Sequence, residues 1–302
     1  MQNFRKKFKG NLVIGMSGLA TVILLFVLVY MLVDITIGGI HNFTWEFLTQ
    51  SPREGMTRGG IFPAIVGTVA LVLIMVVAAV PVGVITAIYL NEYSKKNSVF
   101  TKMIRFSVNT LAGVPSIVFG LFGLGFFIQF IGTGIDKIVS NGQTLVWGQP
   151  NILWASMTMA LLTLPVVIVT VEETLRSIPD DLRAASLALG ATKWQTIRKI
   201  VLPNAVSGIL TGTILAVSRG AGEVAPILFT GAAYFLPNLP HSLSDQFMNL
   251  GYHVYIMSTQ SVDVEATKGI QYASVMVLLM VTFSLNFTAT IIRFKMRKRR
   301  IQ

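Results

Sequence analysis

Residues 172–203 read EETLRSIPDDLRAASLALGATKWQTIRKIVLP, a polar stretch between two long apolar runs. Ser177 is a predicted helix N-cap, and the proline and two aspartates that follow it favour the first turn of a helix. Gly190 supplies the positive φ that ends this helix, and Thr192 can cap the next one. The apolar faces are formed by Leu182, Ala185 and Leu189 in the first helix and by Trp194, Ile197 and Val201 in the second. The stretch therefore predicts two short amphipathic helices hinged at Gly190.

Apolar runs on both sides of this stretch decide the class of protein. Of the 302 residues, 53% are hydrophobic and only 12% are charged, which is typical of a chain that faces lipid. A helix needs about 20 apolar residues to cross ~30 Å of hydrocarbon. Six runs are that long, at residues 12–33, 61–90, 108–131, 152–171, 205–236 and 271–292. The first run exceeds the apolar region of a signal peptide and lacks a small-residue cleavage site, so it is predicted to be an anchor. We therefore predict an all-α, polytopic membrane protein with six transmembrane helices.

Basic residues are distributed unequally between the connections. Nineteen Lys and Arg residues lie before the first run, in 91–105, in 172–203 and after Ile292. The opposite connections hold four, which are Arg53, Arg58, Lys137 and Lys268. The positive-inside rule then places both termini in the cytoplasm. Anionic lipid head groups account for the net charge of +11, so the basic tail 293–302 is predicted to contact membrane lipid and no nucleic acid is predicted.

Several kinds of chemistry have no support in the sequence. With no cysteine, disulfides, thiolate catalysis and Cys-based metal sites are excluded. We interpret His41, His241 and His253 as solvated residues of the outer loops, because their spacing gives no metal-site signal. The sequence has no G-x-x-x-x-G-K-[ST] loop for nucleotide phosphates, so no enzyme activity, cofactor or metal is predicted. Transport against a gradient would draw its energy from an ion or from a partner subunit.

The spacing within 172–203 resembles the coupling segment of ATP-binding-cassette importer permeases. Their pattern is Glu-Ala-Ala, three residues, Gly, nine residues, then Ile-x-Leu-Pro. The matching positions, which together with Arg183 are the predicted contacts to an ATPase, are Ala184, Ala185, Ser186, Gly190, Ile200, Leu202 and Pro203. Ala184 replaces the family's glutamate, which removes a carboxylate that could contact the ATPase. The alternative interpretation is an ordinary pair of interfacial helices.

Three further stretches resemble the phosphate-specific permeases of that family. They are GGIFPAIVGT at 59–68, LAGVPSIVFGLFGLG at 111–125 and SRGAGEVAPILFTG at 218–231, and the last resembles the PstA-type subunit more than the PstC type. The resemblance implies the type I, MetI-like permease fold. It implies an N-terminal helix and outer loop in 1–58 and a transmembrane core in 59–292.

The same resemblance implies a function and partners. It implies a subunit that carries inorganic phosphate across the plasma membrane of a bacterium or archaeon. The implied partners are a second, PstC-like permease subunit, a dimer of PstB-like ATP-binding subunits and a PstS-like extracytoplasmic phosphate-binding protein. Alternatives are a permease for another oxyanion such as molybdate or sulfate, an ion-coupled secondary transporter, and a regulatory protein that recruits a cytoplasmic kinase. A secondary transporter would usually show repeats or several buried acids, whereas Glu223 is the only acid deep in a predicted span.

Two charged residues lie about midway along the fifth apolar run. Arg219 and Glu223 are four residues apart and are predicted to share one helical face. Charges at the bilayer centre are costly, so this pair should face protein or a water-filled cavity. Arginine suits an oxyanion because its planar fork can donate two parallel hydrogen bonds. The pair is predicted to line a substrate pathway, and the alternative is a buried structural ion pair.

A second predicted break lies at Pro115, which lacks an N–H and disfavours helix at Val114. A helix that restarts near Ser116 could direct free N–H groups at an anion. Alternatively, the proline and nearby glycines simply let helices pack closely. Ser116 and Asn109 are therefore the remaining candidate residues of the substrate pathway.

Overall fold

The computed structural model describes residues 2–53, 58–95, 98–140, 142–261 and 264–298. Two predicted sources of cytoplasmic charge, Lys96 and residues 299–302 of the basic tail, lie outside these ranges. The first elements of the chain are α1 (Gln2–Gly39), α2 (Trp45–Thr49), β1 (Pro52–Arg53) and β2 (Arg58–Gly59). The next are α3 (Phe62–Ile88), the π-helical η2 (Tyr89–Tyr93), α4 (Val99–Ala112), α5 (Ser116–Phe122), the π-helical η3 (Gly123–Gly132) and α6 (Thr133–Ser140). The last are α7 (Ile152–Arg176), α8 (Asp180–Ala188), α9 (Lys193–Thr196), the π-helical η4 (Ile197–Val201), α10 (Leu202–Gly222), α11 (Leu250–Thr259) and α12 (Val264–Lys298).

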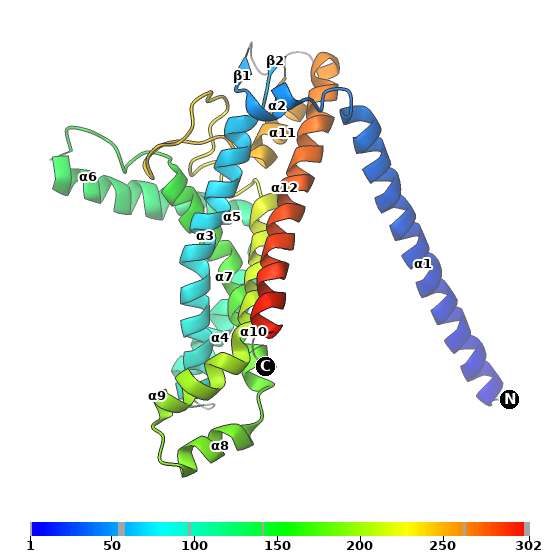
Figure 1. Cartoon of the computed structure of the whole chain (residues 1–302), viewed down its shortest axis with the longest axis vertical. Helices are drawn as coiled ribbons and strands as arrows, with labels where there is room; N and C mark the ends of the chain where they lie inside the picture. The colour runs from blue at the N-terminus through cyan, green and yellow to red at the C-terminus, as the bar shows by residue number, and fades with distance from the viewer. Residues whose placement is uncertain (1, 54–57, 96–97, 141, 262–263, 299–302) are drawn as a thin grey trace.

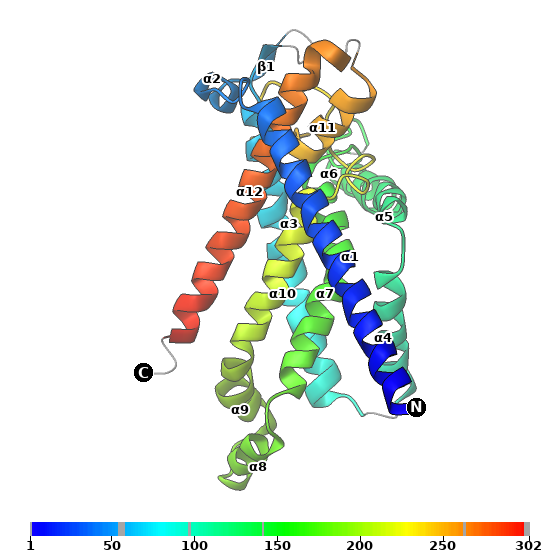
Figure 2. The same ribbon diagram turned by 90° about the vertical axis from the view of Figure 1, so that its right-hand side faces the viewer.

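Six helices in the described ranges are long and apolar enough to cross a membrane, which confirms the predicted number. They cover Gly10–Gly39, Phe62–Tyr93, Ser116–Ser140, Ile152–Arg176, Lys193–Gly222 and Thr267–Met296. Figures 1 and 2 show the start of α1 and the end of α12 pointing toward the end of the molecule that carries α8 and α9, whereas α2 and α11 lie at the opposite end. The polar hairpin is therefore on the side toward which both of these helix ends point.

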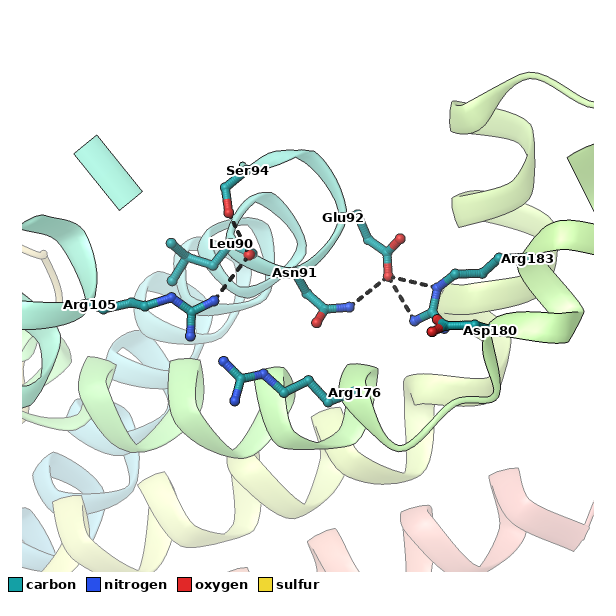
Figure 3. Close-up of a pocket in the computed structure, with 8 residues that line it drawn as sticks. All are labelled: Leu90, Asn91, Glu92, Ser94, Arg105, Arg176, Asp180 and Arg183. Atoms are coloured by element: carbon teal, nitrogen blue, oxygen red, sulfur yellow. Dashed lines mark hydrogen bonds and ion pairs between the residues drawn. The ribbon is translucent and has the colours of Figure 1, made fainter. Parts of the chain in front are cut away.

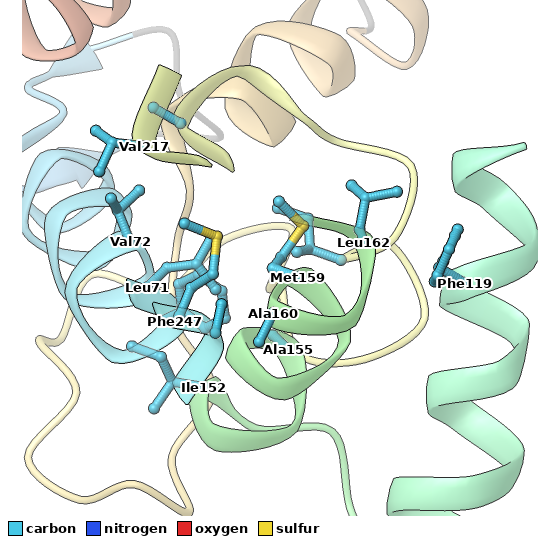
Figure 4. Packing of buried hydrophobic residues seen from close by; sticks show 14 residues of the cluster. Leu71, Val72, Phe119, Ile152, Ala155, Met159, Ala160, Leu162, Val217 and Phe247 are labelled. Carbon is cyan, nitrogen blue, oxygen red and sulfur yellow. The ribbon is translucent and has the colours of Figure 1, made fainter. Parts of the chain in front are cut away.

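The core lies where α3, α7 and α10 pack together. Leu71 and Met75 of α3 are fully buried against Met159 of α7, and Val217 of α10 joins the same cluster. Phe247, from the irregular segment before α11, is also fully buried there (Figure 4). The core thus ties the irregular segment after α10 to the two central helices.

The first span stands apart from this core. Figure 1 shows α1 leaving the bundle at a wide angle from its outer end, and none of its most apolar 18 residues is buried. Its contact with α12 is at the outer end, where Gly39 lies against the backbone of Ala273 and the hydroxyl of Tyr272 donates a 3.1 Å hydrogen bond to Asp34. The side of α1 is therefore left for lipid or for another subunit.

The third span begins later than the apolar run suggested. The predicted span 108–131 is broken at Gly113, and the transmembrane helix runs instead over Ser116–Ser140. Pro115 is the cause, because it is extended (ψ 139°) and its ring disfavours helix at the preceding residue. The residues before the break belong to α4, a separate helix with a single buried residue, Thr101.

The fifth span ends earlier than predicted. The helical prediction for 205–236 is wrong beyond Gly222, because Glu223 is already extended (φ −81°, ψ 132°). Gly220, Gly222 and Pro226 are poor helix formers, although the segment remains apolar. Figures 1 and 2 show that α10 stops well short of the end reached by α12. The chain beyond Gly222 therefore crosses part of the bundle as irregular backbone.

Candidate functional site

The polar stretch contains the first of the two short helices that the sequence predicts, α8, but the second, α9, is the first turn of a helix that continues through η4 and α10 to Gly222. Gly190 lies between α8 and α9 with φ +83°, and a Cβ added there would meet no atom within 4 Å. The backbone conformation, rather than lack of space, therefore favours glycine. Thr192 and Gln195 form a reciprocal capping box that starts α9.

The predicted cap of α8 is wrong. Ser177 instead follows the last residue of α7, and its hydroxyl donates a 2.8 Å hydrogen bond to the carbonyl of Thr174. Pro179 occupies the N-cap position of α8, with no side-chain cap bond. Because the residue before a proline avoids the helical region, α8 starts only after Pro179. Its first turn then contains Asp180 and Asp181, as predicted.

Apolar side chains of the hairpin are exposed on its outward surface. No residue of α8 is buried, and Ala184 and Ala185 are exposed. Leu189 is 90% exposed and Trp194 is 56% exposed. Leu187 adds to this surface. A face of this kind at a helix hairpin is suited to contact another protein.

The second half of the stretch anchors the hairpin to the bundle. Ile197 and Val201 are buried with Val171 and Leu175 of α7. The remaining pattern residues, Ile200, Leu202 and Pro203, are half-buried where η4 passes into α10. Because the same continuous helix carries the hairpin and α10, a displacement at the hairpin acts directly on the fifth span.

Arg183, a predicted ATPase contact, is turned toward the helix bundle, and its assignment to the ATPase remains a prediction. Figure 3 shows its guanidinium directed at Glu92 of η2, with Nη2 2.9 Å from Oε1 of that carboxylate. The guanidinium also donates to the carbonyl oxygens of Ile178 (2.7 Å) and Leu175 (2.8 Å). Arg183 therefore holds α8 to the membrane domain.

A polar cavity of about 610 Å³ lies beside this ion pair. Arg105 of α4 and Arg176 of α7 line it together with Arg183 (Figure 3). Oε1 of Glu172 accepts from Arg105 at 2.6 Å and from Arg176 at 2.7 Å. Glu92, Glu172 and Arg105 were not among the predicted site residues. Only the ion pair of Glu172 with Arg176, at helical i, i+4 spacing, has a local sequence signal.

Two of the three stretches that resemble phosphate permeases, 111–125 and 218–231, meet in space, and glycines in all three lie close to other parts of the bundle. A Cβ at Gly120 would lie 3.0 Å from the carbonyl oxygen of Pro226, so α5 touches the segment after α10. A Cβ at Gly67 of α3 would overlap the backbone of Met248, which precedes α11. A Cβ at Gly220 would overlap Met75 of α3. These glycines allow the irregular segment to sit close to the core helices.

Arg219 and Glu223 come together at the end of α10. Nε of Arg219 lies 3.4 Å from Oε1 of Glu223, and the side chains are 35% and 27% exposed. The prediction that they share a helical face is wrong, because the helix ends between them, but the contact forms across that end. Within the described ranges, the two Nη groups of Arg219 have no hydrogen-bond acceptor. The pair is therefore accessible, and the arginine retains free donors.

The other two candidates are not drawn into this contact. Ser116 is half-buried in the first turn of α5, and Asn109 is exposed on α4. No hydrogen bond joins either side chain to Arg219 in the described part of the chain. Their assignment to a substrate pathway remains a prediction.

One histidine is not where the sequence analysis placed it. His41 and His241 are exposed, but His253 of α11 is 2% exposed. Neither ring nitrogen has a partner among the described residues. Burial lowers the pKa of His253 from 6.5 to about 4, so the ring is neutral at physiological pH. A search of the described residues finds no group of His, Asp and Glu arranged to hold a metal ion.

Sequence comparisons link the chain to a family of transport proteins. Residues 79–298 match the model described as "Binding-protein-dependent transport system inner membrane component". Phosphate transport system permease protein PstA 1 of Mycobacterium tuberculosis (strain CDC 1551 / Oshkosh) is 31% identical over 303 residues, covering 98% of this chain and 92% of the relative. Phosphate transport system permease protein PstA of Yersinia pestis is 38% identical over 225 residues, covering 74% and 66%.

Solved structures show the same fold. A bacterial alginate ABC transporter in complex with an alginate pentasaccharide-bound periplasmic protein contains a chain that superposes with a TM-score of 0.66 at 17% identity, over 94% of both chains. A chain of the inward-facing MetNI methionine ABC transporter superposes with a TM-score of 0.52 at 18% identity, over 78% of this chain and 94% of the other. The predicted MetI-like permease fold is confirmed.

Proposed function

Because the chain belongs to the family of binding-protein-dependent inner membrane transport components, we propose that it is a permease subunit of an ATP-binding-cassette importer for inorganic phosphate. The observation that carries the proposal is the hairpin of α8 and α9, which presents an exposed apolar face on a helix continuous with a transmembrane span. Phosphate as substrate is supported by the relatives from Mycobacterium tuberculosis and Yersinia pestis. The ATPase activity belongs to a separate subunit in this proposal.

The proposed topology places the hairpin and both termini in the cytoplasm of a bacterium or archaeon. The excess of Lys and Arg on the hairpin side of the membrane supports it. An ATPase dimer then binds this hairpin and the corresponding hairpin of a second permease subunit. An extracytoplasmic phosphate-binding protein docks at the end that carries α2 and α11. Leu187, Leu189 and Trp194 supply the contact with the ATPase, while Ala184 contributes surface without charge.

Arg219 is the proposed phosphate contact. Its free Nη donors and its partial exposure support this role, as does its place where helical backbone gives way to irregular backbone, which in membrane proteins lines cavities. Glu223 holds the guanidinium while the pathway is empty. Phosphate then displaces the carboxylate, because two parallel N–H donors fit an oxyanion better than the single 3.4 Å contact.

The test is ATP-driven uptake of radiolabelled phosphate into vesicles that contain the reconstituted assembly. Wild type, Arg219→Ala and Lys137→Ala are compared at equal complex content. Lys137 is exposed on α6, so its replacement removes the same charge away from α10. Loss of uptake in Arg219→Ala alone supports the arginine as a pathway residue. Equal uptake by all three proteins would contradict that role and leave Arg219 a structural residue.

Competition experiments with the same vesicles identify the transported anion. Phosphate uptake that resists an excess of sulfate and molybdate supports phosphate as the transported anion. Competition by either at equal concentration would instead favour an importer for another oxyanion. Uptake without the ATPase subunits would contradict an ATP-driven importer and favour an ion-coupled transporter.

A further inference from the structure

The contacts that hold α8 to the membrane domain are few and polar. Apolar packing cannot position this helix, because none of its residues is buried. Ser186 meets Thr196 through a 2.9 Å hydroxyl contact, but that joins α8 to α9 within the hairpin. Arg183 provides the link to the rest of the molecule. Its side chain reaches Glu92 at the end of the second span, whereas the contact of Ser186 reaches the start of the fifth.

Arg183 is held in a defined geometry. Both Nε (3.2 Å) and Nη2 (2.9 Å) donate to the same oxygen of Glu92. Nη1 donates to the carbonyl oxygen of Ile178 and Nη2 to that of Leu175, at 2.7 and 2.8 Å. A guanidinium with several short bonds keeps one orientation, unlike the isolated contact of an exposed ion pair. Arg183 therefore connects α8, the end of α7 and η2.

Glu92, the partner of Arg183 on η2, is also held in a defined position. Its side chain is 8% exposed, and Nδ2 of Asn91 donates a 2.8 Å hydrogen bond to its Oε1. η2 continues α3 without interruption. A second contact reaches η2 from α9, where Nζ of Lys193 lies 5.0 Å from the ring centroid of Tyr93. The cytoplasmic end of α3 thus receives both helices of the hairpin.

The other described ion pairs near Arg183 do not connect α8 to a transmembrane span. Glu172 joins Arg105 of α4 to Arg176 of α7, and none of these residues belongs to α8. Asp180 contacts Nη1 of Arg183 at 3.1 Å, but it belongs to α8 and is 98% exposed. Among the described ion pairs, Arg183 with Glu92 is the one that crosses from α8 to a transmembrane span.

We infer that the ion pair between Arg183 and Glu92 makes α3 move together with α8. Closure of the ATPase dimer would then displace the second span, α3, as well as α7 and α10. This inference rests on the proposed function. Met75 of α3 fills the space at Gly220, next to Arg219. A displacement of α3 is thereby passed to the proposed phosphate contact through direct packing.

Distance measurements between spin labels test the inference without phosphate. The chain has no cysteine, so single cysteines can be introduced at Asp181 on α8 and at Ile85 on α3, both of which are exposed. The pair is measured in the complete assembly, without nucleotide and with ATP bound to a hydrolysis-deficient ATPase. We expect one unchanged distance in both states for the wild type. Glu92→Gln should broaden or shift it when ATP binds.

Asp180→Asn is the matched control. It removes the same charge from the same arginine, but on α8 itself, so the distance should stay unchanged between states. The phosphate taken up per ATP hydrolysed should fall severalfold in Glu92→Gln and stay at the wild-type value in Asp180→Asn, at equal complex content. A distance that changes with ATP in the wild type would overturn the inference. So would identical behaviour of the two variants.

Failure of the proposed function gives a different result. An assembly that does not form with ATPase subunits, or that forms and carries no phosphate in the wild type, contradicts the importer. An assembly that forms and transports, but in which Glu92→Gln matches the control, contradicts only the role of the ion pair.

Discussion

Nε of Arg219 and Oε1 of Glu223 lie 3.4 Å apart across the point at which α10 ends. The contact bridges helical and irregular backbone, so each side chain depends on a different element for its position. Arg219 is fixed by α10 and by the packing of Gly220 on Met75. Glu223 is fixed only by the extended chain that follows.

This geometry predicts different effects for two replacements of the arginine. Arg219→Lys keeps the charge but loses the planar fork, and charge-assisted hydrogen bonds contribute about 1.5–3 kcal/mol each. We expect the KM for phosphate uptake to rise by about 10- to 100-fold. Glu223→Gln removes the competing carboxylate and should leave KM unchanged or lower. A KM that responds equally to both variants would favour a structural ion pair.

Gly190 offers a test of the coupling hairpin. Its φ of +83° costs a β-branched residue about 1–2 kcal/mol or more, so Gly190→Val should misalign α8 and α9 and weaken ATPase binding. Gly190→Asn is the control, because asparagine tolerates this conformation. Co-purification of the ATPase with the two variants measures the difference. Equal loss in both would show that lack of a side chain, rather than backbone conformation, is required.

His253 predicts a loss of stability in acid. Burial holds its pKa at about 4, against 6.5 for the free side chain. Between these values the unfolded state binds more protons than the folded state, so stability falls as the pH drops from 6.5 toward 4. The total is on the order of 3 kcal/mol. Melting temperatures across this range should show a smaller slope for His253→Phe than for the wild type, and parallel curves would contradict the assignment.

The carboxylate of Asp136 is expected to hold the backbone of residues 146–148 in place. This buried carboxylate accepts backbone N–H groups from Val146 (3.0 Å), Trp147 (3.0 Å) and Gly148 (2.7 Å). Asp136→Asn replaces one acceptor oxygen with a donor that faces these same N–H groups. Amide exchange should then accelerate at residues 146–148 but not at the capped start of α9. Unchanged exchange at these amides would contradict the role of Asp136.

Local signals in the sequence were sufficient for the turn at Gly190, for the cap at Thr192 and for the number of spans. Gly190 and Thr192 act on their immediate neighbours, so their effect can be predicted without the fold. The end of α10 could not be located in this way, because apolar residues continue to Phe235 after the helix stops. Hydropathy reports burial in the membrane, and irregular backbone inside a bundle is buried as well.

Long-range contacts account for the remaining differences. Arg183 and Glu92 are 91 residues apart, and a pairing of that kind leaves no periodic pattern. The burial of His253 depends on its packing in the fold, so a loop of mixed polarity gave no sign of it. The contacts of Arg183 with Glu92 and with the carbonyl oxygen of Leu175 have no sequence signal for the same reason, and its predicted contact with the ATPase stays a prediction.

The early end of α10 also shapes the electrical potential along the proposed route. The last carbonyl groups of a helix have no intrahelical donors and carry roughly half a negative charge. Gly222 is exposed, and a Cβ added there would meet no atom within 4 Å, so these carbonyl groups would face an anion on the proposed route. Arg219, in the last turn, offsets that charge. Without Arg219 the C-terminal end of α10 would repel the anion. The arginine therefore makes the electrostatic potential at this helix end positive, in addition to donating hydrogen bonds to the anion.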